Sequence, residues 1–348
     1  MPDLFAAKLI AWQRLHGRHD LPWQASRDPY AIWVAEIMLQ QTQVATVIPY
    51  YERFMARFPD ISALASATEE EVLTYWAGLG YYARGRNLRK AAQIMRELHA
   101  GRFPSSFDEV AALPGIGPST AAAICVFAFG QRHAILDGNV KRVLALAFGV
   151  SGYPGAKNVE SALWQLARSF LPEDDLETYT QALMDLGATI CTRSKPRCDI
   201  CPVKPDCLAL RDKRVSELPS PRPRRTLPER HAQFLVIRHG LDLLLEKRPA
   251  PGIWGGLWSL PETDPDSDPA QACLQVSGQL PGRIQVLPAL THSFTHFKLH
   301  IQPIEVTLSR KPSRMQESGG QIWMPLADAV HAALPKAVQK ILRELVPE

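Results

Sequence analysis

The sequence predicts a mainly α-helical N-terminal domain joined to a smaller α+β domain at the C-terminus. Over residues 1–210, apolar residues recur at spacings of three and four, and short Gly, Pro and Asp breaks separate the segments, as expected for helices. A stretch rich in basic residues and proline follows at 211–229 and reads as an extended linker. Over residues 230–348 the pattern changes to short strands with a helical end.

Two strand pairs are expected in the C-terminal domain. The runs AQFLVIR and LDLLLEKR flank a His-Gly turn, and THSFTHFKLHIQPIEVTL reads as a second pair. The later stretch LADAVHAALPKAVQKILREL has helical spacing.

Length, charge and hydropathy narrow the function classes. The 348 residues, 46% of them hydrophobic, suffice for two domains of about 100–200 residues, each with its own core. A formal net charge of +4 permits a polyanionic partner but does not require one. No apolar run reaches the ~18 residues of a membrane span, and the N-terminus reads as an amphipathic helix rather than a signal peptide. We therefore expect a soluble protein without a membrane partner. The sequence does not determine the oligomeric state, for which a monomer is the default expectation.

Four of the six cysteines stand together with the spacing C-x6-C-x2-C-x5-C; they are Cys191, Cys198, Cys201 and Cys207. Four thiolates can hold either a tetrahedral zinc ion or an iron–sulfur cube. Most structural zinc sites use two C-x2-C pairs, whereas this segment has one, so the spacing favours a [4Fe–4S] cluster over zinc. The basic residues between the cysteines have two interpretations: they bind DNA phosphates, or they only keep the loop solvated.

A glycine-containing turn joins two helices in AALPGIGPSTAAAICVFAFG. Gly115 and Gly117 free the backbone to adopt positive φ and to expose N–H groups, and Pro118 and Ser119 suit the first turn of the next helix. An anion could bind there, at the N-terminus of the second helix. The alternative is a plain corner between two helices.

An acid interrupts the apolar helix in VAEIMLQQTQ. At 100° per residue, Glu36, Gln40 and Gln43 share one narrow helix face. Apolar surroundings raise the pKa of a carboxyl group because desolvation disfavours its charge, so Glu36 could act as a general acid. The alternative is a surface glutamate paired with Arg or Lys.

A second acid, Asp137, ends an apolar run in AILDGNVKR and precedes a new helix. Asp is a favoured helix N-cap, which is the simplest interpretation. The functional interpretation is a carboxylate that stays ionised in a polar turn. Two carboxylic acids in opposed environments are what cleavage of a glycosidic bond requires, because one protonates the leaving group and the other stabilises the cationic sugar.

Together these segments resemble the helix–hairpin–helix DNA glycosylases that carry an iron–sulfur cluster, and the finer matches resemble the MutY adenine DNA glycosylases. The matching stretches are LPWQ, EIMLQQTQV, GLGYYARGRNL, LPGIGPSTA, LDGNVKRVL and MDLGATICTRSKPRC. This family excises adenine from duplex DNA carrying A:8-oxoguanine or A:G mispairs. The resemblance implies a base excision repair enzyme of the bacterial cytoplasm with a [4Fe–4S] cluster held in the loop 191–207.

The resemblance also implies catalytic roles. Glu36 matches the acid that protonates adenine N7 and later helps to activate water. Asp137 matches the carboxylate that stabilises the oxocarbenium-like sugar, and Asn139 matches its supporting asparagine. The buried acid would then hold its proton until an adenine, flipped out of the stack, arrives.

DNA-binding roles follow in the same way. Gly115 and Gly117 match the hairpin that binds a backbone phosphate, while Gln41 and Tyr81 match groups that wedge into the duplex beside 8-oxoguanine. Ser119 stands on the same DNA-facing hairpin, where related endonuclease III proteins carry a lysine that attacks the sugar. A serine hydroxyl cannot form a Schiff base, so strand cleavage should be weak or absent. The alternative is a bifunctional, endonuclease III-like glycosylase–lyase acting on oxidised pyrimidines.

The second half resembles the MutT/Nudix-like domain of the same family through LPERHAQFLVIR, LLLEKRP, GIWGGLWSLPE and THSFTHFKLHI. A working Nudix hydrolase needs a Glu-rich helix after the GGLW segment, and residues 262–277 contain no such run. We therefore expect a recognition domain that does not carry out metal-dependent hydrolysis. Phe294, Thr295 and His296 match a Phe-Ser-His loop that reads 8-oxoguanine. Thr295 departs from the serine of that loop, keeping the hydroxyl but adding a methyl group.

Overall fold

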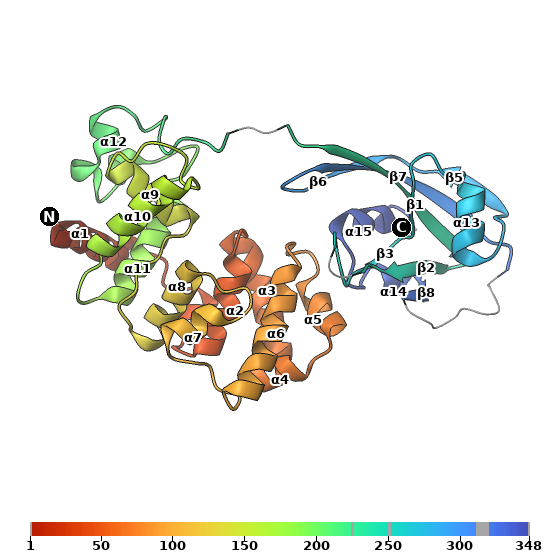
Figure 1. Ribbon diagram of the computed structural model, residues 1–348, viewed down its shortest axis with the longest axis horizontal. Coiled ribbons are helices and arrows are strands. Elements are labelled where there is room, and N and C mark those ends of the chain that lie inside the picture. Colours follow the sequence, from red (N-terminus) through yellow and green to blue (C-terminus); the bar gives the residue numbers. More distant parts are fainter. Residues whose placement is uncertain (1, 224–225, 250–251, 311–319, 347–348) are drawn as a thin grey trace. The chain divides into compact units, whose positions relative to one another are not determined.

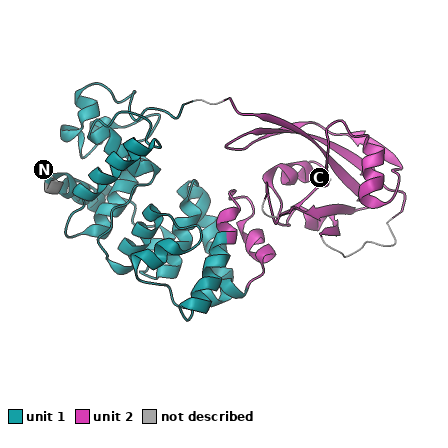
Figure 2. Ribbon diagram, in the orientation of Figure 1, with its two compact units in different colours: residues 1–66, 87–224 teal, residues 67–86, 225–348 magenta. Residues whose placement is uncertain are grey.

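The computed structural model describes residues 2–223, 226–249, 252–310 and 320–346. The chain forms two compact units, and neither is a continuous stretch of sequence (Figure 2). The first unit contains residues 1–66 and 87–224, and the second contains residues 67–86 and 225–348. No helix in the described residues has both the length and the apolar content needed to cross a membrane.

The first unit is helical, as the sequence predicts. Its helices are α1 (Pro2–His16), η1 (Pro22–Gln24), α2 (Pro29–Leu39), α3 (Val44–Arg57), α4 (Ile61–Ser66), most of α6 (Ala83–Leu98), α7 (Phe107–Ala112), α8 (Pro118–Phe129), α9 (Gly138–Ala147), α10 (Lys157–Ser169), α11 (Leu176–Asp185), η2 (Leu186–Ile190), η3 (Cys198–Ile200), η4 (Lys204–Asp206) and α12 (Leu208–Arg211). Polar side chains start several helices: Asp28, Ser106 and Asp137 each accept a hydrogen bond from a backbone N–H of the first turn.

A core built from α1 and from α8 to α11 supports this unit. Leu9, Leu144, Leu163, Tyr179 and Leu186 are almost fully buried in it. Each such side chain contributes roughly 1.5–3 kcal/mol by leaving water. The same core holds α9 against η2, the π-helical turn that leads into the cysteine loop.

The second unit is built on one eight-stranded mixed sheet (Figure 1). Its elements are α5 (Glu69–Trp76), β1 (Glu229–His239), β2 (Asp242–Lys247), β3 (Trp258–Ser259), β4 (Glu262–Thr263), α13 (Pro269–Ser277), β5 (Arg283–Val286), β6 (Leu290–Ser293), β7 (Lys298–Thr307), β8 (Gln321–Pro325), α14 (Leu326–Ala329) and α15 (Lys336–Arg343). The central order is β3-β2-β1-β7-β5, and β4, β6 and β8 pair with β1, β7 and β2. The predicted hairpins β1–β2 and β6–β7 are both confirmed.

Helix α13 covers one face of this sheet. Cys273 of α13 packs with Leu235, Ile237, Ile304 and Val306 of β1 and β7, so this isolated cysteine is a core residue. Helix α13, PAQACLQVS, contains no acidic residue.

Residues 67–86 group with the C-terminal half, although the sequence boundary at 210 assigns them to the first domain. Glu70 of α5 accepts hydrogen bonds from Trp258 Nε1 at 2.7 Å and from Lys247 Nζ at 2.9 Å. Arg86 donates to the carbonyl of Gly255 at 2.5 Å. Sequence periodicity could not reveal this grouping, because it depends on contacts between segments that are far apart in the chain.

The stretch predicted as a linker is only partly extended. Leu218 is buried against Leu146 and Ala209, and the backbone N–H of Ser220 donates to the carbonyl of Gly152. The connector therefore follows the first unit as far as residue 220. Residues 224–225 lie outside the described part of the chain.

Candidate active site and cysteine centre

Helix α2 places Glu36 among apolar neighbours. Asp28 caps the helix, Pro29 occupies its first turn, and Ile32, Trp33 and Ile37 are buried. The helix ends at Leu39. The spacing predicted that Gln43 shares a helix face with Glu36, and this is wrong. Gln43 lies beyond the end of α2 and is the N-cap residue of α3.

Glu36 is half-buried and faces Asp137 of the loop before α9. Desolvation, followed by the negative charge of Asp137, raises the pKa of Glu36 to about 8. The carboxyl group therefore stays largely protonated at neutral pH. This matches the raised pKa that its apolar neighbours predicted.

Asp137 is the N-cap of α9, as the simplest interpretation of the sequence held. Its carboxylate accepts the backbone N–H of Val140 at 2.8 Å. Burial raises the pKa of Asp137, which differs from the polar turn expected from the sequence. The backbone N–H groups of Val140 and Asn139 and the charges of Arg142 and Lys141 lower it again. These groups stabilise the negative charge of Asp137. Glu36 has the opposite situation, because the negative charge of Asp137 disfavours ionisation of Glu36. We therefore infer that Asp137 loses its proton at a lower pH than Glu36 does.

Arg142 connects this site to the cysteine loop. Its Nη2 donates to Asn139 Oδ1 at 2.9 Å and to the carbonyl of Gly187 at 2.6 Å, and its Nε donates to the carbonyl of Cys191 at 2.7 Å. Sequence reasoning missed this residue. The sequence signal that could have identified Arg142 is its position three residues after Asn139, because this spacing places both side chains on one face of α9.

Ser119 links the first turn of α8 to the segment that carries Asp137. Its Oγ accepts the backbone N–H of Leu136 at 2.9 Å. Gln40, at the C-terminus of α2, donates from Nε2 to the carbonyl of Gly115 and to Thr120 Oγ1, both at 3.3 Å. Hydrogen bonds therefore join the hairpin and α8 to the end of α2, which carries Glu36, and to the segment that precedes Asp137.

The hairpin turn joins α7 to α8, as predicted. Gly115 has φ +82°, and a Cβ there would lie 3.0 Å from Asn87 Cβ. Gly117 differs from the expectation, because its φ of −93° is accessible to any residue. A Cβ at Gly117 would meet no atom within 4 Å, and Gly117 caps α8 without a side chain. The α8 N-terminus is thus open to an approaching group.

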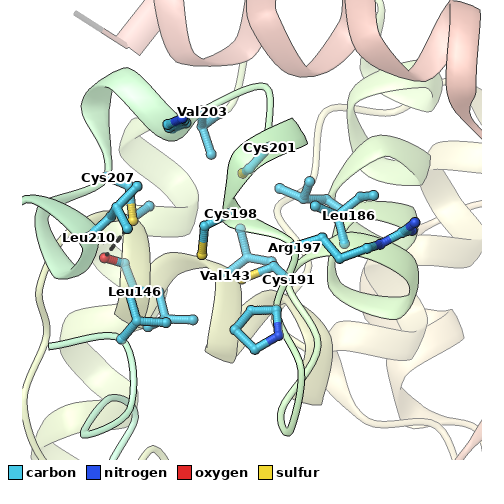
Figure 3. A pocket seen from close by; sticks show the side chains of 15 residues that line it. Val143, Leu146, Leu186, Cys191, Arg197, Cys198, Cys201, Val203, Cys207 and Leu210 are labelled. Carbon is cyan, nitrogen blue, oxygen red and sulfur yellow. Dashed lines mark hydrogen bonds between the residues drawn. The ribbon is translucent and has the colours of Figure 1, made fainter. Parts of the chain in front are cut away.

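The four clustered cysteines line one cavity with Val143, Leu186 and Val203 (Figure 3). Burial raises the pKa of Cys191 to about 12 and that of Cys201 to about 11, so these thiols keep their protons unless a metal replaces them. The thiol of Cys207 donates to the carbonyl of Leu146 at 3.5 Å.

A basic groove runs beside this centre. It is lined by Gly138 at the start of α9, by residues 192–194 and 196 of the cysteine loop and by connector residues between 213 and 222. Its cationic side chains are Lys141, Arg142, Arg193, Lys213 and Arg222. The groove combines positive charge with the helix N-terminus that holds Asp137, an arrangement suited to a polyanion.

Gln41 and Tyr81 share an unusual backbone conformation. Gln41, in the first unit, has φ +58°, and Tyr81, in the second unit, has φ +48°. Both side chains are exposed, Tyr81 to 46%. Such left-handed positions are uncommon outside glycine and often mark functional turns.

The predicted Phe294-Thr295-His296 segment forms the turn between β6 and β7. Phe294 stacks on Phe297 at 4.4 Å and lies 5.3 Å from the ring of Trp254. Thr295 and His296 are exposed, with Thr295 Oγ1 3.4 Å from His296 Nδ1. A rigid aromatic base therefore carries an exposed hydroxyl and an exposed imidazole.

Residues 34–169 match the HhH-GPD superfamily base excision DNA repair protein family, and residues 232–344 match the NUDIX domain. An adenine DNA glycosylase of Buchnera aphidicola subsp. Acyrthosiphon pisum is 38% identical over 97% of this chain and 97% of its own length. The Homo sapiens adenine DNA glycosylase is 33% identical over 97% of this chain and 73% of its own.

Solved structures resemble the helical half. A thermostable thymine-DNA glycosylase aligns with a TM-score of 0.54 and 28% identity, over 61% of this chain and 97% of its own. An endonuclease III from a non-covalent DNA complex aligns with a TM-score of 0.52 and 19% identity, over 61% of this chain and 98% of its own. At that identity the second likeness concerns the fold alone.

Proposed function

This chain belongs to the adenine DNA glycosylases, hydrolases of base excision repair, and we propose that it releases adenine mispaired with 8-oxoguanine or guanine in duplex DNA. The observation that carries the proposed mechanism is the pairing of Glu36 with Asp137. One of these two acids keeps its proton at neutral pH, and the other is the first to ionise.

The first step is acid-assisted cleavage. Glu36 donates its proton to N7 of the flipped adenine, the bond between C1′ and N9 breaks, and the bonding electrons leave with the base. The raised pKa of Glu36 supports this role, because an acid with a pKa of about 8 still holds its proton at pH 7.

The second step is capture of the sugar cation. The carboxylate of Asp137 stabilises the positive charge at C1′, and water attacks that carbon while the ionised Glu36 accepts its proton. Asn139 holds this arrangement: its backbone N–H favours the charged form of Asp137, and its side chain is fixed by Arg142.

The reaction stops at base release. Strand cleavage by the lyase route needs an amine that attacks C1′, and the hairpin offers the hydroxyl of Ser119 in its place. That hydroxyl already accepts the N–H of Leu136, which supports a positioning role for Ser119. The serine at this position therefore supports a monofunctional enzyme over the bifunctional alternative.

Backbone phosphates are bound at two places in the first unit. One is the open N-terminus of α8 at Gly115 and Gly117, where exposed N–H groups and the helix dipole attract an anion. The other is the basic groove beside the cysteine centre. Gln41 and Tyr81 enter the duplex, for which their exposed, left-handed positions are suited.

The turn 294–297 reads the base opposite adenine. Phe294, held by Phe297, supplies an apolar surface, while Thr295 and His296 supply hydrogen-bonding groups that can tell 8-oxoguanine from guanine. A working Nudix hydrolase needs a Glu-rich helix, and α13 contains no acidic residue. This Nudix-like domain therefore recognises the base opposite adenine and does not hydrolyse nucleotides.

The cysteine centre holds a [4Fe–4S] cluster. The four cysteines line one cavity, which brings together the four thiolates that an iron–sulfur cube requires. The segment has a single C-x2-C pair, whereas most structural zinc sites use two, and this supports the cube over zinc. A cluster there would pin the loop 191–207 to α9 and η2.

The experiment uses a duplex with adenine opposite 8-oxoguanine and scores alkali-labile sites under single-turnover conditions. The wild-type protein should release adenine, and Glu36→Gln should be slower by about 10²–10⁴-fold, the range of general acid catalysis. Duplex affinity and the visible absorption of the cluster should be unchanged in the variant. If adenine is not released while the cluster is intact, the proposal fails. Borohydride trapping of a wild-type protein–DNA adduct would favour the bifunctional alternative.

A further inference from the structure

Three side chains from two adjacent strands gather on one face of the C-terminal sheet. Glu229 and His231 of β1 are two residues apart, so they point to the same side. The parallel register places His231 directly beside His300 of β7. One ligand atom from each of Glu229, His231 and His300 lies within 4.8 Å of the other two. Of the described residues, only this trio of His, Cys or acidic side chains is so close.

His300 is oriented as a metal-binding histidine would be. Its Nδ1 lies 3.0 Å from Thr291 Oγ1 of the neighbouring strand β6, which can fix the tautomer and leave the Nε2 lone pair free. That Nε2 is buried, and the Glu229 carboxylate is the group that faces it. It lies 3.3 Å from Oε2 of Glu229.

The separation of these two atoms fits one tetrahedral ion. Nitrogen and oxygen ligands bind zinc at about 2.0–2.2 Å, so two of them lie about 3.3–3.5 Å apart. The other oxygen of Glu229, Oε1, accepts a hydrogen bond from Lys298 at 3.3 Å, which leaves Oε2 available. The rings of His231 and His300 are nearly parallel, at 19°, with centroids 4.8 Å apart. A small rotation of the His231 side chain would therefore bring its imidazole nitrogen to the same ion as the third ligand.

We propose that Glu229, His231 and His300 form a binding site for a divalent transition-metal ion, with Zn²⁺ as the best match. Two imidazoles and one carboxylate suit zinc, and water would fill the fourth position. The ion would join β1 to β7 at the base of the turn that carries Phe294 to Phe297. It would therefore stabilise the end of the sheet where these two central strands begin, and no catalytic role is assigned to it.

The test is a Zn²⁺ titration of the full-length protein with its cysteine centre loaded, followed by calorimetry and by the melting temperature. One Zn²⁺ should bind per chain. His300→Ala and the isosteric Glu229→Gln should weaken binding by at least about tenfold, as loss of a ligand predicts. Thr291→Val, which removes only the partner of Nδ1, should weaken it by about 10–100-fold. His331→Ala, an exposed histidine of the same unit, is the matched control and should bind as the wild type does.

A second measurement separates this site from the cysteines. Co²⁺ bound by nitrogen and oxygen ligands gives visible bands without the intense thiolate charge-transfer band that cysteine ligation produces. The wild type should show the first spectrum and His300→Ala should lose it. Absence of Zn²⁺ binding, binding unchanged in both His300→Ala and Glu229→Gln, or a thiolate-type spectrum would each overturn the proposal.

Discussion

Arg142 donates a hydrogen bond to Asn139 Oδ1 at 2.9 Å, and the same guanidinium holds the carbonyl oxygens of Gly187 and Cys191. One side chain therefore fixes the start of α9, the π-helical turn and the first cysteine of the loop. Because Asn139 also favours the charged form of Asp137, any displacement of the cysteine loop would reach the carboxylate proposed to stabilise the sugar cation through two hydrogen-bonded residues.

Arg142→Lys tests this connection while retaining the positive charge. A lysine cannot reproduce the planar fork, so at least one of the three hydrogen bonds is lost, at about 1.5–3 kcal/mol for a bond from a charged group. We expect the single-turnover rate of adenine release to fall by roughly 10–100-fold. The exposed Arg14, paired with Asp175, provides the control, and Arg14→Lys should leave the rate unchanged. Equal rates for both variants would contradict the role given to Arg142.

Gly187 is a position where a single methyl group should be damaging. A Cβ there would lie 2.5 Å from Asn139 Cβ and 3.1 Å from its Cα, so backbone would have to move. Gly187→Ala should lower the free energy of unfolding by about 1–3 kcal/mol, the usual cost of overpacking, and should slow adenine release. Denaturant unfolding and single-turnover kinetics measure the two effects. Ala188→Ser, an exposed change in the same turn, should alter neither.

Local sequence patterns predicted much of the fold and the candidate site. The hairpin around Gly115, the N-cap at Asp137 and the strands on either side of Phe294 all follow from short-range chemistry. Glu36 could be singled out because a carboxyl group among apolar neighbours either pairs with a cation or keeps its proton, and its helix contains no Arg or Lys.

The missed features depend on long-range contacts. Arg142 looks like an ordinary helix-surface cation until the cysteine loop is brought against it. The helix break before Gln43 and the φ of Gly117 depend on how α2 and α8 meet their neighbours, which periodicity does not encode. The grouping of residues 67–86 with the C-terminal sheet has the same origin.

Thr295 should act through its hydroxyl group. Thr295→Ser keeps that group and should retain the preference for adenine opposite 8-oxoguanine over adenine opposite guanine. Thr295→Ala should reduce the preference about fivefold, since a hydrogen bond contributes about 1 kcal/mol net. Competition between the two duplexes measures the ratio. If Thr295→Ser loses the preference as fully as Thr295→Ala does, the methyl group rather than the hydroxyl is what matters.

The rate of adenine release should fall as the pH rises through about 8. The reason is that Glu36 must be protonated to act, and its pKa is raised to about 8 by desolvation and by Asp137. Single-turnover rates from about pH 6 to about pH 9.5 should therefore show a plateau followed by a roughly tenfold decrease per pH unit. Glu36→Gln, which has no proton to lose, should give a flat residual rate over the same interval. A wild-type rate that stays constant throughout would rule out Glu36 as the acid.

The same carboxyl group should make the wild-type protein less stable as the pH rises. The ordinary pKa of Glu36 is 4.5 and its folded value is about 8, so between these limits the folded chain binds more protons than the unfolded chain. The contribution of Glu36 to the free energy of unfolding is therefore fully present below pH 4.5 and is lost progressively up to about pH 8. Glu36→Gln removes this loss, so the variant should gain stability over the wild type between about pH 5 and about pH 8. Urea unfolding of both proteins at several pH values tests it; a constant difference would show that the two states bind protons equally at this site.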